Sequence, residues 1–234
     1  MKRTRLGSAA LALVILSLAA CDDKQASPTT TPSASASAPM PTPEATVIPS
    51  ASAAPKKKIV CDPTANPVVF NEPGLEAEVR KKLSKADGPI SKDDLAKVKS
   101  INLTQVQVDE LDPCIFPKLT GVHDIFLGKG DLTDLVPLST LAQLVSLRAT
   151  GTQVADITPL VRMVHMDRLD LSHSPVSDIT TIASMTDLTE LSLDDTSVND
   201  LTPLAKLTKL EHVSIRNTGV KDLKPLLGAK KLKS

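Results

Sequence analysis

The sequence predicts an α/β solenoid, in which similar coils stack and each coil adds one short strand to a parallel sheet. Two observations predict this fold class. Aspartates recur at a spacing of 22 residues, and apolar residues alternate in the segment before each of them; the aspartates are Asp134, Asp156, Asp178, Asp200 and Asp222. Alternation with period two puts the apolar side chains on one face of a strand, and each coil buries that face only by stacking on its neighbours.

The repeating unit reads Leu-x-x-Leu-x-Leu-x-x-Thr-x-Val-x-Asp-Ile-x-Pro-Leu-x-x-Leu. It resembles the 22-residue leucine-rich repeat of internalins. The resemblance implies a leucine-rich-repeat solenoid, with a parallel β-sheet on the concave side and short 3-10 or turn segments on the convex side. About six coils fit residues 95–234, and the first carries two extra residues near Cys114. Residues 230–234 are expected to begin a seventh strand.

Two polar positions of the unit have a predicted role in the backbone. A hydroxyl stands where the family usually has asparagine, at Thr152, Ser174, Thr196 and Thr218. We expect this side chain to bond the backbone as the coil turns. The recurrent aspartate is expected to accept a backbone N–H where the return segment begins, and the proline three residues later suits a turn that needs no donor there.

Residues 56–94 are predicted to form a small helical N-terminal cap, because a solenoid exposes its first core face unless something covers it. Asn71 can cap a helix with Pro73 in its first turn, and Leu75, Val79 and Leu83 form one apolar stripe. A shorter helical turn is expected to start at Ser91. This stretch resembles the cap that precedes internalin-type repeats.

Residues 1–20 have the pattern of an export signal, with three basic residues before a short apolar run. A transmembrane anchor is the alternative, but the run is too short to cross ~30 Å of hydrocarbon. Leu18-Ala19-Ala20-Cys21 resembles the bacterial lipobox, which implies a cut before Cys21 and lipidation of its thiol. A simple secretory cut is the other alternative.

Residues 21–55 comprise Cys21 and a predicted disordered tether. Of the 34 residues after Cys21, 26 are Ala, Pro, Ser or Thr, and apolar periodicity is absent. Such a composition cannot bury enough surface to offset the entropy of ordering. The segment therefore reads as a stalk that holds a domain away from a membrane.

Cys61 and Cys114 are the two cysteines that remain once Cys21 carries lipid. An even pair in an exported protein favours a disulfide, which would join the cap to the first coil. The alternative is two separate thiols, one of them buried as a small apolar residue.

Outward strand positions form three columns across the concave face. From these columns we select the aromatic and the charged or titratable side chains as candidate partner-binding residues. Binding energy at protein interfaces concentrates in aromatic and arginine side chains. The neighbours in a column lie close enough to pair, and we expect the pairs Arg148–Asp170, Arg168–Glu190, Glu190–His212 and Asp194–Arg216. The candidates are Phe126, Arg148, Arg168, Asp170, Glu190, Asp194, His212 and Arg216.

Composition argues against several other functions. Basic and acidic residues both number 27, and the chain has no Trp or Tyr, so a nucleic-acid footprint or stacking platform is not expected. His212, Glu190 and Ser214 or Ser192 could imitate a catalytic set, but no oxyanion hole is indicated. The four histidines lack metal-ligand spacing. We therefore expect no enzyme, no metal, no cofactor and no small-molecule substrate.

The sequence as a whole favours a non-enzymatic lipoprotein of a bacterial cell envelope, facing the periplasm or the surface. It would be held to a membrane through its lipidated N-terminus and would bind another protein through the concave face. The alternative is a structural or glycan-associated envelope component with no partner on that face.

Overall fold

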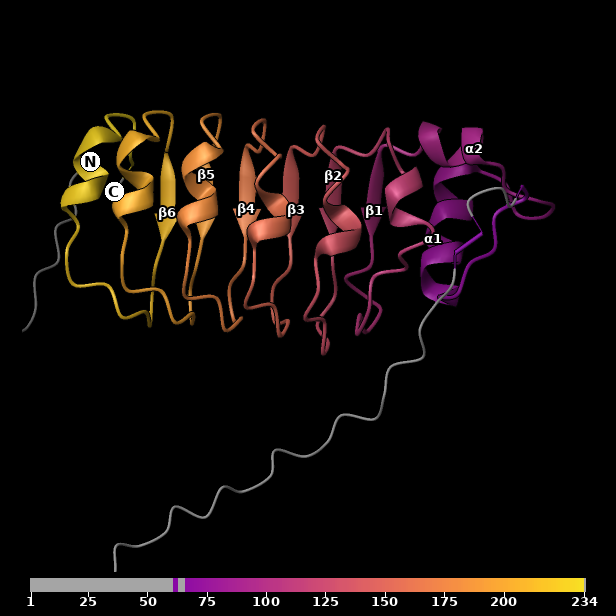
Figure 1. Ribbon diagram of the computed structural model, residues 1–234, viewed down its shortest axis with the longest axis horizontal. Helices are drawn as coiled ribbons and strands as arrows, with labels where there is room; N and C mark the ends of the chain where they lie inside the picture. The colour runs from indigo at the N-terminus through magenta and orange to yellow at the C-terminus, as the bar shows by residue number, and fades with distance from the viewer. Residues whose placement is uncertain (1–60, 63–65, 234) are drawn as a thin grey trace, which may run out of the picture. The chain divides into compact units, whose positions relative to one another are not determined.

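The computed structural model describes residues 61–62 and 66–233, which belong to a compact unit spanning Pro55–Ser234. The predicted signal, Cys21 and the tether lie outside the described residues. The described chain forms the predicted leucine-rich-repeat solenoid (Figure 1). Its strands are β1 (Ser100–Asn102), β2 (Asp124–Phe126), β3 (Ser146–Arg148), β4 (Arg168–Asp170), β5 (Glu190–Ser192) and β6 (His212–Ser214).

The six strands form one parallel sheet in sequence order, and each strand pairs with the next in register. Ile101 lies opposite Ile125, and the line continues through Leu147, Leu169, Leu191 and Val213. The two extra residues of the first coil are therefore absorbed after β1 without disturbing the pairing. We call the outward side of the strands the sheet face; it is the surface predicted as concave.

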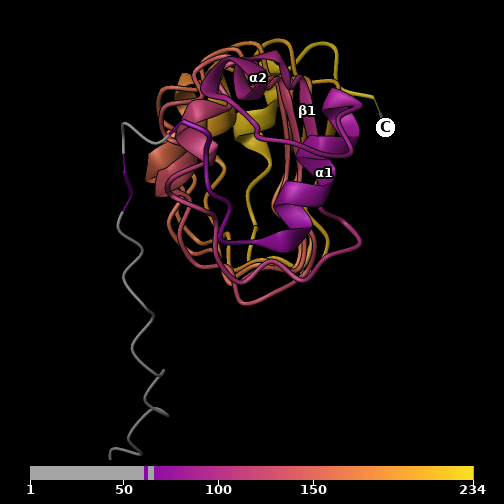
Figure 2. The ribbon, with the colours of Figure 1, turned by 90° about the vertical axis from the view of Figure 1, so that its right-hand side faces the viewer.

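Short 3-10 segments carry the chain back on the opposite side from the sheet (Figure 2). Each starts two residues after a recurrent aspartate, except in the first coil, where η1 starts four residues after Asp112, which stands 22 residues before Asp134. They are η1 (Phe116–Lys118), η2 (Val136–Leu138), η3 (Thr158–Leu160), η4 (Thr180–Ser184), η5 (Thr202–Lys206) and η6 (Lys224–Gly228).

The aspartate and hydroxyl positions of the unit act as predicted. Asp134, Asp156, Asp178, Asp200 and Asp222 each accept the backbone N–H two residues ahead, over 2.7–2.9 Å. The hydroxyls of Thr152, Ser174, Thr196 and Thr218 each donate to the carbonyl oxygen three residues back. The chain thus bonds its own backbone at both bends of the coil.

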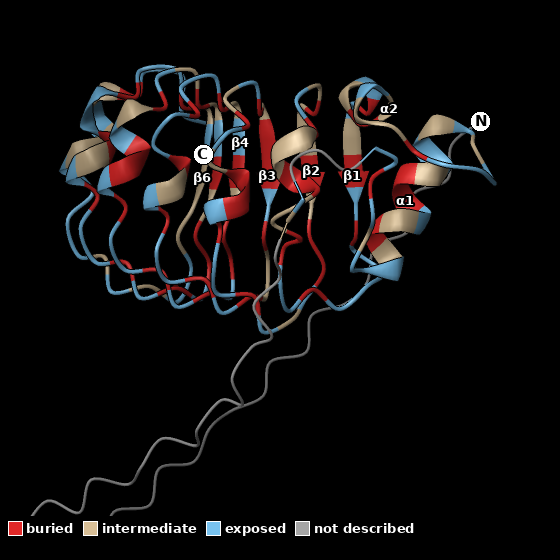
Figure 3. Ribbon diagram, turned by 45° about the vertical axis from the view of Figure 1, so that its right-hand side comes forward, coloured by how far each residue is buried: buried red, intermediate tan, exposed pale blue. Residues whose placement is uncertain are grey.

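The core runs between the sheet and the 3-10 segments as one cluster of leucine, isoleucine and valine (Figure 3). Ile101, Ile125, Leu147, Leu169 and Leu191 are all at most 1% exposed. The last coil differs, because Val213, Ile215 and Leu226 are only half-buried and Leu223 and Leu227 are exposed. The hydrogen-bonded ladder nevertheless reaches Lys233, whose N–H donates to the Glu211 carbonyl. No seventh strand forms within the described residues.

The N-terminal cap comprises α1 (Pro73–Leu83) and α2 (Lys92–Lys97). Leu75 and Val79 are buried and Leu83 is half-buried, as the apolar stripe predicted. Ser91 caps α2 through a reciprocal pair of bonds with Asp94. The prediction that Asn71 caps α1 was wrong, because Glu72 holds that position and Asn71 bonds Asp112 in the first coil.

Two contacts close the cap onto the sheet. The Glu78 carboxylate, only 8% exposed, accepts the backbone N–H of Asn102 at the free edge of β1. Asp112, 1% exposed, accepts from the backbone and side-chain nitrogens of Asn71. A cap side chain therefore supplies the acceptor that an earlier strand would otherwise provide.

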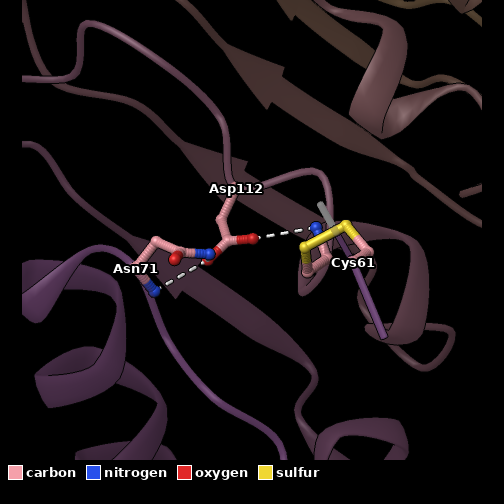
Figure 4. Close-up of a disulfide and its surroundings, with 4 residues drawn as sticks. Cys61, Asn71 and Asp112 are labelled. Carbon is pink, nitrogen blue, oxygen red and sulfur yellow. Dashed lines mark hydrogen bonds between the residues drawn. A yellow bond between two sulfur atoms is a disulfide. The ribbon is translucent and has the colours of Figure 1, made fainter. Parts of the chain in front are cut away.

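The predicted disulfide between Cys61 and Cys114 is present, with a Cα–Cα distance of 5.2 Å. Figure 4 shows it beside Asp112, which also accepts the backbone N–H of Cys114 at 2.8 Å. One buried carboxylate thus bonds both the start of the cap and the cysteine that ties residue 61 to the first coil.

Candidate functional site

The sheet face is built from alternate strand residues that point away from the core. The central residue is buried in β1 to β5 and half-buried in β6, and its two neighbours face outward, because period two fixes them on opposite sides. Adjacent strands lie ~4.8 Å apart, so outward side chains of successive coils come within reach of each other. The face is therefore a lattice of side chains whose positions the repeat determines.

A shallow hollow of about 280 Å³ lies in the middle of the sheet face. It spans β2 to β5 and brings together five of the eight candidate residues: Phe126, Arg148, Arg168, Asp170 and Glu190. Ser146 and Ser192 complete the polar part of the lining. The hollow offers one aromatic ring beside two guanidinium groups, which are side chains that often anchor protein interfaces.

Arg148 and Asp170 form the pair predicted from their spacing, with Nε 3.1 Å from Oδ2. The arginine side chain stays 55% exposed, so it can still meet another surface. Arg168 differs, since its Nε lies 3.7 Å from the Asp167 carboxylate and makes no bond to Glu190. Glu190 has no side-chain partner in residues 66–233 and is exposed. The hollow therefore holds one neutralised pair and two weakly engaged charges.

A second shallow hollow, of about 400 Å³, continues along the face toward β6. It shares Glu190 and Ser192 with the first and adds His212, Ser214 and Lys233. Lys233 Nζ lies 2.5 Å from the Glu211 carboxylate. The predicted pairing of Glu190 with His212 does not form within the described part of the chain, so both side chains remain accessible at the join.

Asp194 and Arg216 form the most enclosed polar cluster of the face. The Asp194 Oδ2 accepts from Arg216 Nε at 2.9 Å and Nη2 at 2.6 Å, while Oδ1 accepts from the Ser214 hydroxyl and the Arg216 backbone. Burial by itself raises the pKa of Asp194, but these bonds outweigh it and lower the pKa to about 2. Asp194 is only 6% exposed, so Arg216 rather than the carboxylate is presented to solvent.

The side chains of His212, Glu190 and Ser214, which could have resembled a catalytic set, do not bond one another in the described residues. Ser214 donates its hydroxyl to Asp194, and no bond joins it to His212 in the described residues. The hollows are shallow and open, whereas nucleophilic catalysis needs a base bonded to the nucleophile and a water-excluded site. Within residues 61–62 and 66–233, no group of three or more His, Cys, Asp or Glu is placed to hold a metal ion.

Sequence reasoning missed two ladders on the edges of the sheet face. Along one edge, Asp187 lies between His165 and Lys209, and the Lys209 bond is the main cause that lowers the pKa of Asp187. Along the other, Asp195 lies between His173 and Asn217. The same 22-residue spacing would have found both, because each ladder joins equivalent positions of successive coils.

His173, Asp195 and Asn217 also share a left-handed backbone, with φ between 53° and 58°, and the equivalent Gly151 has φ 71°. The chain leaves the sheet through this position in four successive coils. Asn and Asp tolerate the left-handed region better than most residues, and glycine adopts it freely. Histidine is enriched there as well, so the four residues at this position are all types that accept a positive φ.

The fold resembles solved internalins. Internalin C2 from Listeria monocytogenes has 27% sequence identity and a TM-score of 0.66, covering 70% of this chain and 72% of that one. A second Listeria internalin has 25% identity and a TM-score of 0.63, covering 70% of this chain; this chain spans about half of it, at 48%. The functional domain of InlJ, also from Listeria, shares the fold alone, at 18% identity and a TM-score of 0.50.

No protein-family model matches the chain, and a search of curated proteins gives no match either. The solved structures that resemble this chain are internalin-type leucine-rich-repeat proteins, and this similarity supports the fold of the described domain. Within the described residues, no helix is long and apolar enough to cross a membrane.

Proposed function

We propose that this chain is a lipid-anchored leucine-rich-repeat protein of a bacterial cell envelope that binds another protein through its sheet face. The observation that carries the proposal is the central hollow, where Phe126 and Arg148 lie opposite each other on adjacent strands and Arg168 lines the same hollow. The internalin-type fold supports it, because parallel-sheet solenoids offer an extended surface rather than a closed pocket.

The composition of the face favours a modest affinity. Phe126 is its only aromatic side chain in the described residues, and the chain has neither Trp nor Tyr. Since tight interfaces concentrate their energy in buried aromatic and arginine anchors, an interface with one ring and two or three arginines has few strong contacts. Its salt dependence should be marked, because most of its contacts are charged and exposed.

The test is chemical cross-linking in intact native cells, followed by identification of what co-purifies. The test variant is Phe126→Ala, Arg148→Ala, Arg168→Ala. The matched control replaces one apolar and two cationic exposed residues on the 3-10 side, as Val161→Ala, Arg162→Ala, Lys206→Ala. Both variants should unfold at nearly the wild-type temperature, which a thermal melt checks first.

We expect a specific protein to be captured by the wild type and the control and lost from the test variant. Capture of the same protein by all three forms would contradict binding at the hollow. Retention of all three on isolated cell wall, without a protein partner, would favour the structural or glycan-associated alternative.

The anchoring part of the proposal rests on Cys21, which lies outside the described residues. A lipobox cysteine carries several acyl chains, and two or more chains anchor a protein stably. We expect metabolically supplied fatty acid to label the wild type and the protein to sediment with membranes. Cys21→Ala should lose the label and move to the soluble fraction, and labelling that persists in this variant would contradict the proposal.

A further inference from the structure

A separate groove lies at the N-terminal end of the domain, between the start of α1 and the loop that follows β1. It is a cavity of about 180 Å³, distinct from the sheet-face hollows. Its apolar lining comes from Leu75 of the cap and from Leu103, Val106, Val108 and Phe116 of the first coil. Val106 remains 39% exposed, so part of this lining faces solvent.

Carboxylates stand at the rim of the groove. The Glu72 and Glu110 side chains are both exposed, and their carboxylates form no hydrogen bond or ion pair within residues 66–233. Asp109 also lines it, and its carboxylate accepts bonds from Gln107 and from the backbone of Asp131. An apolar floor with two free carboxylates above it fits an occupant that combines aliphatic side chains with ammonium groups.

The segment that precedes Cys61 has this composition. It reads Lys56-Lys57-Lys58-Ile59-Val60, and it lies outside the described residues. It is the only run of three consecutive lysines in the chain. Two aliphatic residues precede the cysteine and could contact the apolar floor of the groove. The three lysines precede those two and could reach the carboxylates at its rim.

The disulfide keeps this segment near the groove. Cys61 and Cys114 have Cα atoms 5.2 Å apart, and Phe116 in the groove wall is two residues from Cys114. Because an extended residue spans at most ~3.6 Å, the Cα of Cys61 lies within about 12 Å of that of Phe116. Five further residues reach roughly 17 Å, which is enough to lie along the groove. Such a tether also gives a high effective concentration.

We propose that residues 56–60 of this chain dock in the N-terminal groove. Ile59 and Val60 pack against Val106 and the apolar floor, and the lysine ammonium groups lie beside Glu72 and Glu110. The docked segment covers the exposed part of the first coil and fixes the point at which the preceding chain leaves the domain. It also denies the groove to basic segments of other proteins. This inference is independent of the function proposed for the sheet face.

The test uses a zero-length carbodiimide, which joins an amine to a carboxylate only where the two already touch. The full chain is prepared in unlabelled and nitrogen-15 forms, mixed in equal amounts, cross-linked and digested for mass spectrometry. We expect peptides that join Lys56, Lys57 or Lys58 to Glu72 or Glu110 within one isotopic form. Mixed-isotope pairs would place a second copy's segment in the groove and overturn the proposal, as would the absence of any such pair.

Tryptic cleavage after Lys56–Lys58 gives an independent readout. Glu72→Gln, Glu110→Gln removes the rim charges without removing a helix cap, since Glu72 makes no capping bond. We expect this variant to be cleaved several-fold faster than the wild type. The matched control is Asp87→Asn, Asp93→Asn, which removes two exposed carboxylates elsewhere on the cap and should leave the rate unchanged. Equal rates in the two variants would overturn the proposal.

Discussion

At the residue scale, three buried carboxylates form hydrogen bonds that join one element of the domain to another. Asp194 binds Arg216 and Ser214 between β5 and β6, Asp112 binds Asn71 and Cys114, and Glu78 accepts the edge amide of β1. A buried carboxylate is stable only when hydrogen bonds and cations offset its desolvation. These three therefore occur where one element must be fixed to another.

The Asp194 cluster predicts a specific loss of stability in acid. The pKa of Asp194 is lowered to about 2 in the folded domain, whereas an unperturbed aspartate titrates near ~3.9. Because the folded pKa is the lower one, the stabilisation is complete above about pH 4 and is lost as the pH falls through 2. Thermal unfolding measured from pH 7 to pH 2 should show a steeper decline for the wild type than for Asp194→Asn.

The capping aspartates add to the same decline, since the pKa of Asp156 is lowered chiefly by the Thr158 backbone N–H and that of Asp200 chiefly by the Thr202 hydroxyl. They are unchanged in Asp194→Asn, so the difference between the two curves isolates the cluster. Parallel curves for the two proteins below pH 4 would show that Asp194 contributes nothing to the acid transition.

Gly128 is predicted to tolerate no side chain. A Cβ there would lie 2.0 Å from the Val106 carbonyl oxygen and 2.6 Å from that of Leu103, in the wider first coil. Because both obstacles are backbone atoms, Gly128→Ala should lower the free energy of unfolding by roughly 1–3 kcal/mol, as overpacking does elsewhere. Urea unfolding measures this. Gly219→Ala is the control, since its Cβ would meet the Asn199 side chain at 3.1 Å, and equal losses would contradict the account.

At the element scale, the central problem is the first strand, because β1 has no coil before it. The structure solves it with α1, which covers the core face, and with Glu78, which bonds the free edge. The disulfide then ties residue 61, which precedes the cap in sequence, to the first coil. Covalent and hydrogen-bonded contacts thus meet on the same short stretch, from Asp112 to Cys114.

Removal of the disulfide should destabilise the domain measurably. The bond closes a loop with a sequence separation of 53 residues, and a native disulfide of this kind contributes about 2–4 kcal/mol, in part by restricting the unfolded chain. Cys61→Ser, Cys114→Ser should therefore unfold at lower urea concentration. The wild type measured with a reductant should match the variant. An unfolding free energy equal to that of the oxidised wild type would show that the cap is held by its other contacts alone.

At the scale of the whole molecule, the period of 22 predicted most of the fold. It predicted the six strands, their register, the capping aspartates and the pairs Arg148–Asp170 and Asp194–Arg216, because each follows from equivalent positions lying side by side. The repeat could not predict contacts between unlike segments. Asn71 bonds Asp112 rather than its own helix, and Arg168 turns to Asp167 rather than Glu190, because side-chain rotamers decide among neighbours at similar distance.

The candidate site was predicted as columns of residues, and the structure adds their grouping. Five of the eight residues line one hollow, His212 lines the next, and Asp194 is buried beneath Arg216. Pattern alone could not group them, because it shows which side of a strand a residue faces but not how its neighbours cover it. The N-terminal groove could not be predicted from the repeat, since its walls come from the cap and from the irregular first coil.

Site-specific photo-cross-linking tests the central claim, that the sheet face is the binding surface, most directly. A photoreactive phenylalanine analogue would replace Arg168 in the hollow, Val161 on the 3-10 side or Leu227 in the last coil, one position at a time, in native cells. The account predicts one protein adduct of constant mass from position 168 and none from the other two. An adduct from position 161 or 227, with none from 168, would place the binding surface elsewhere and contradict the claim.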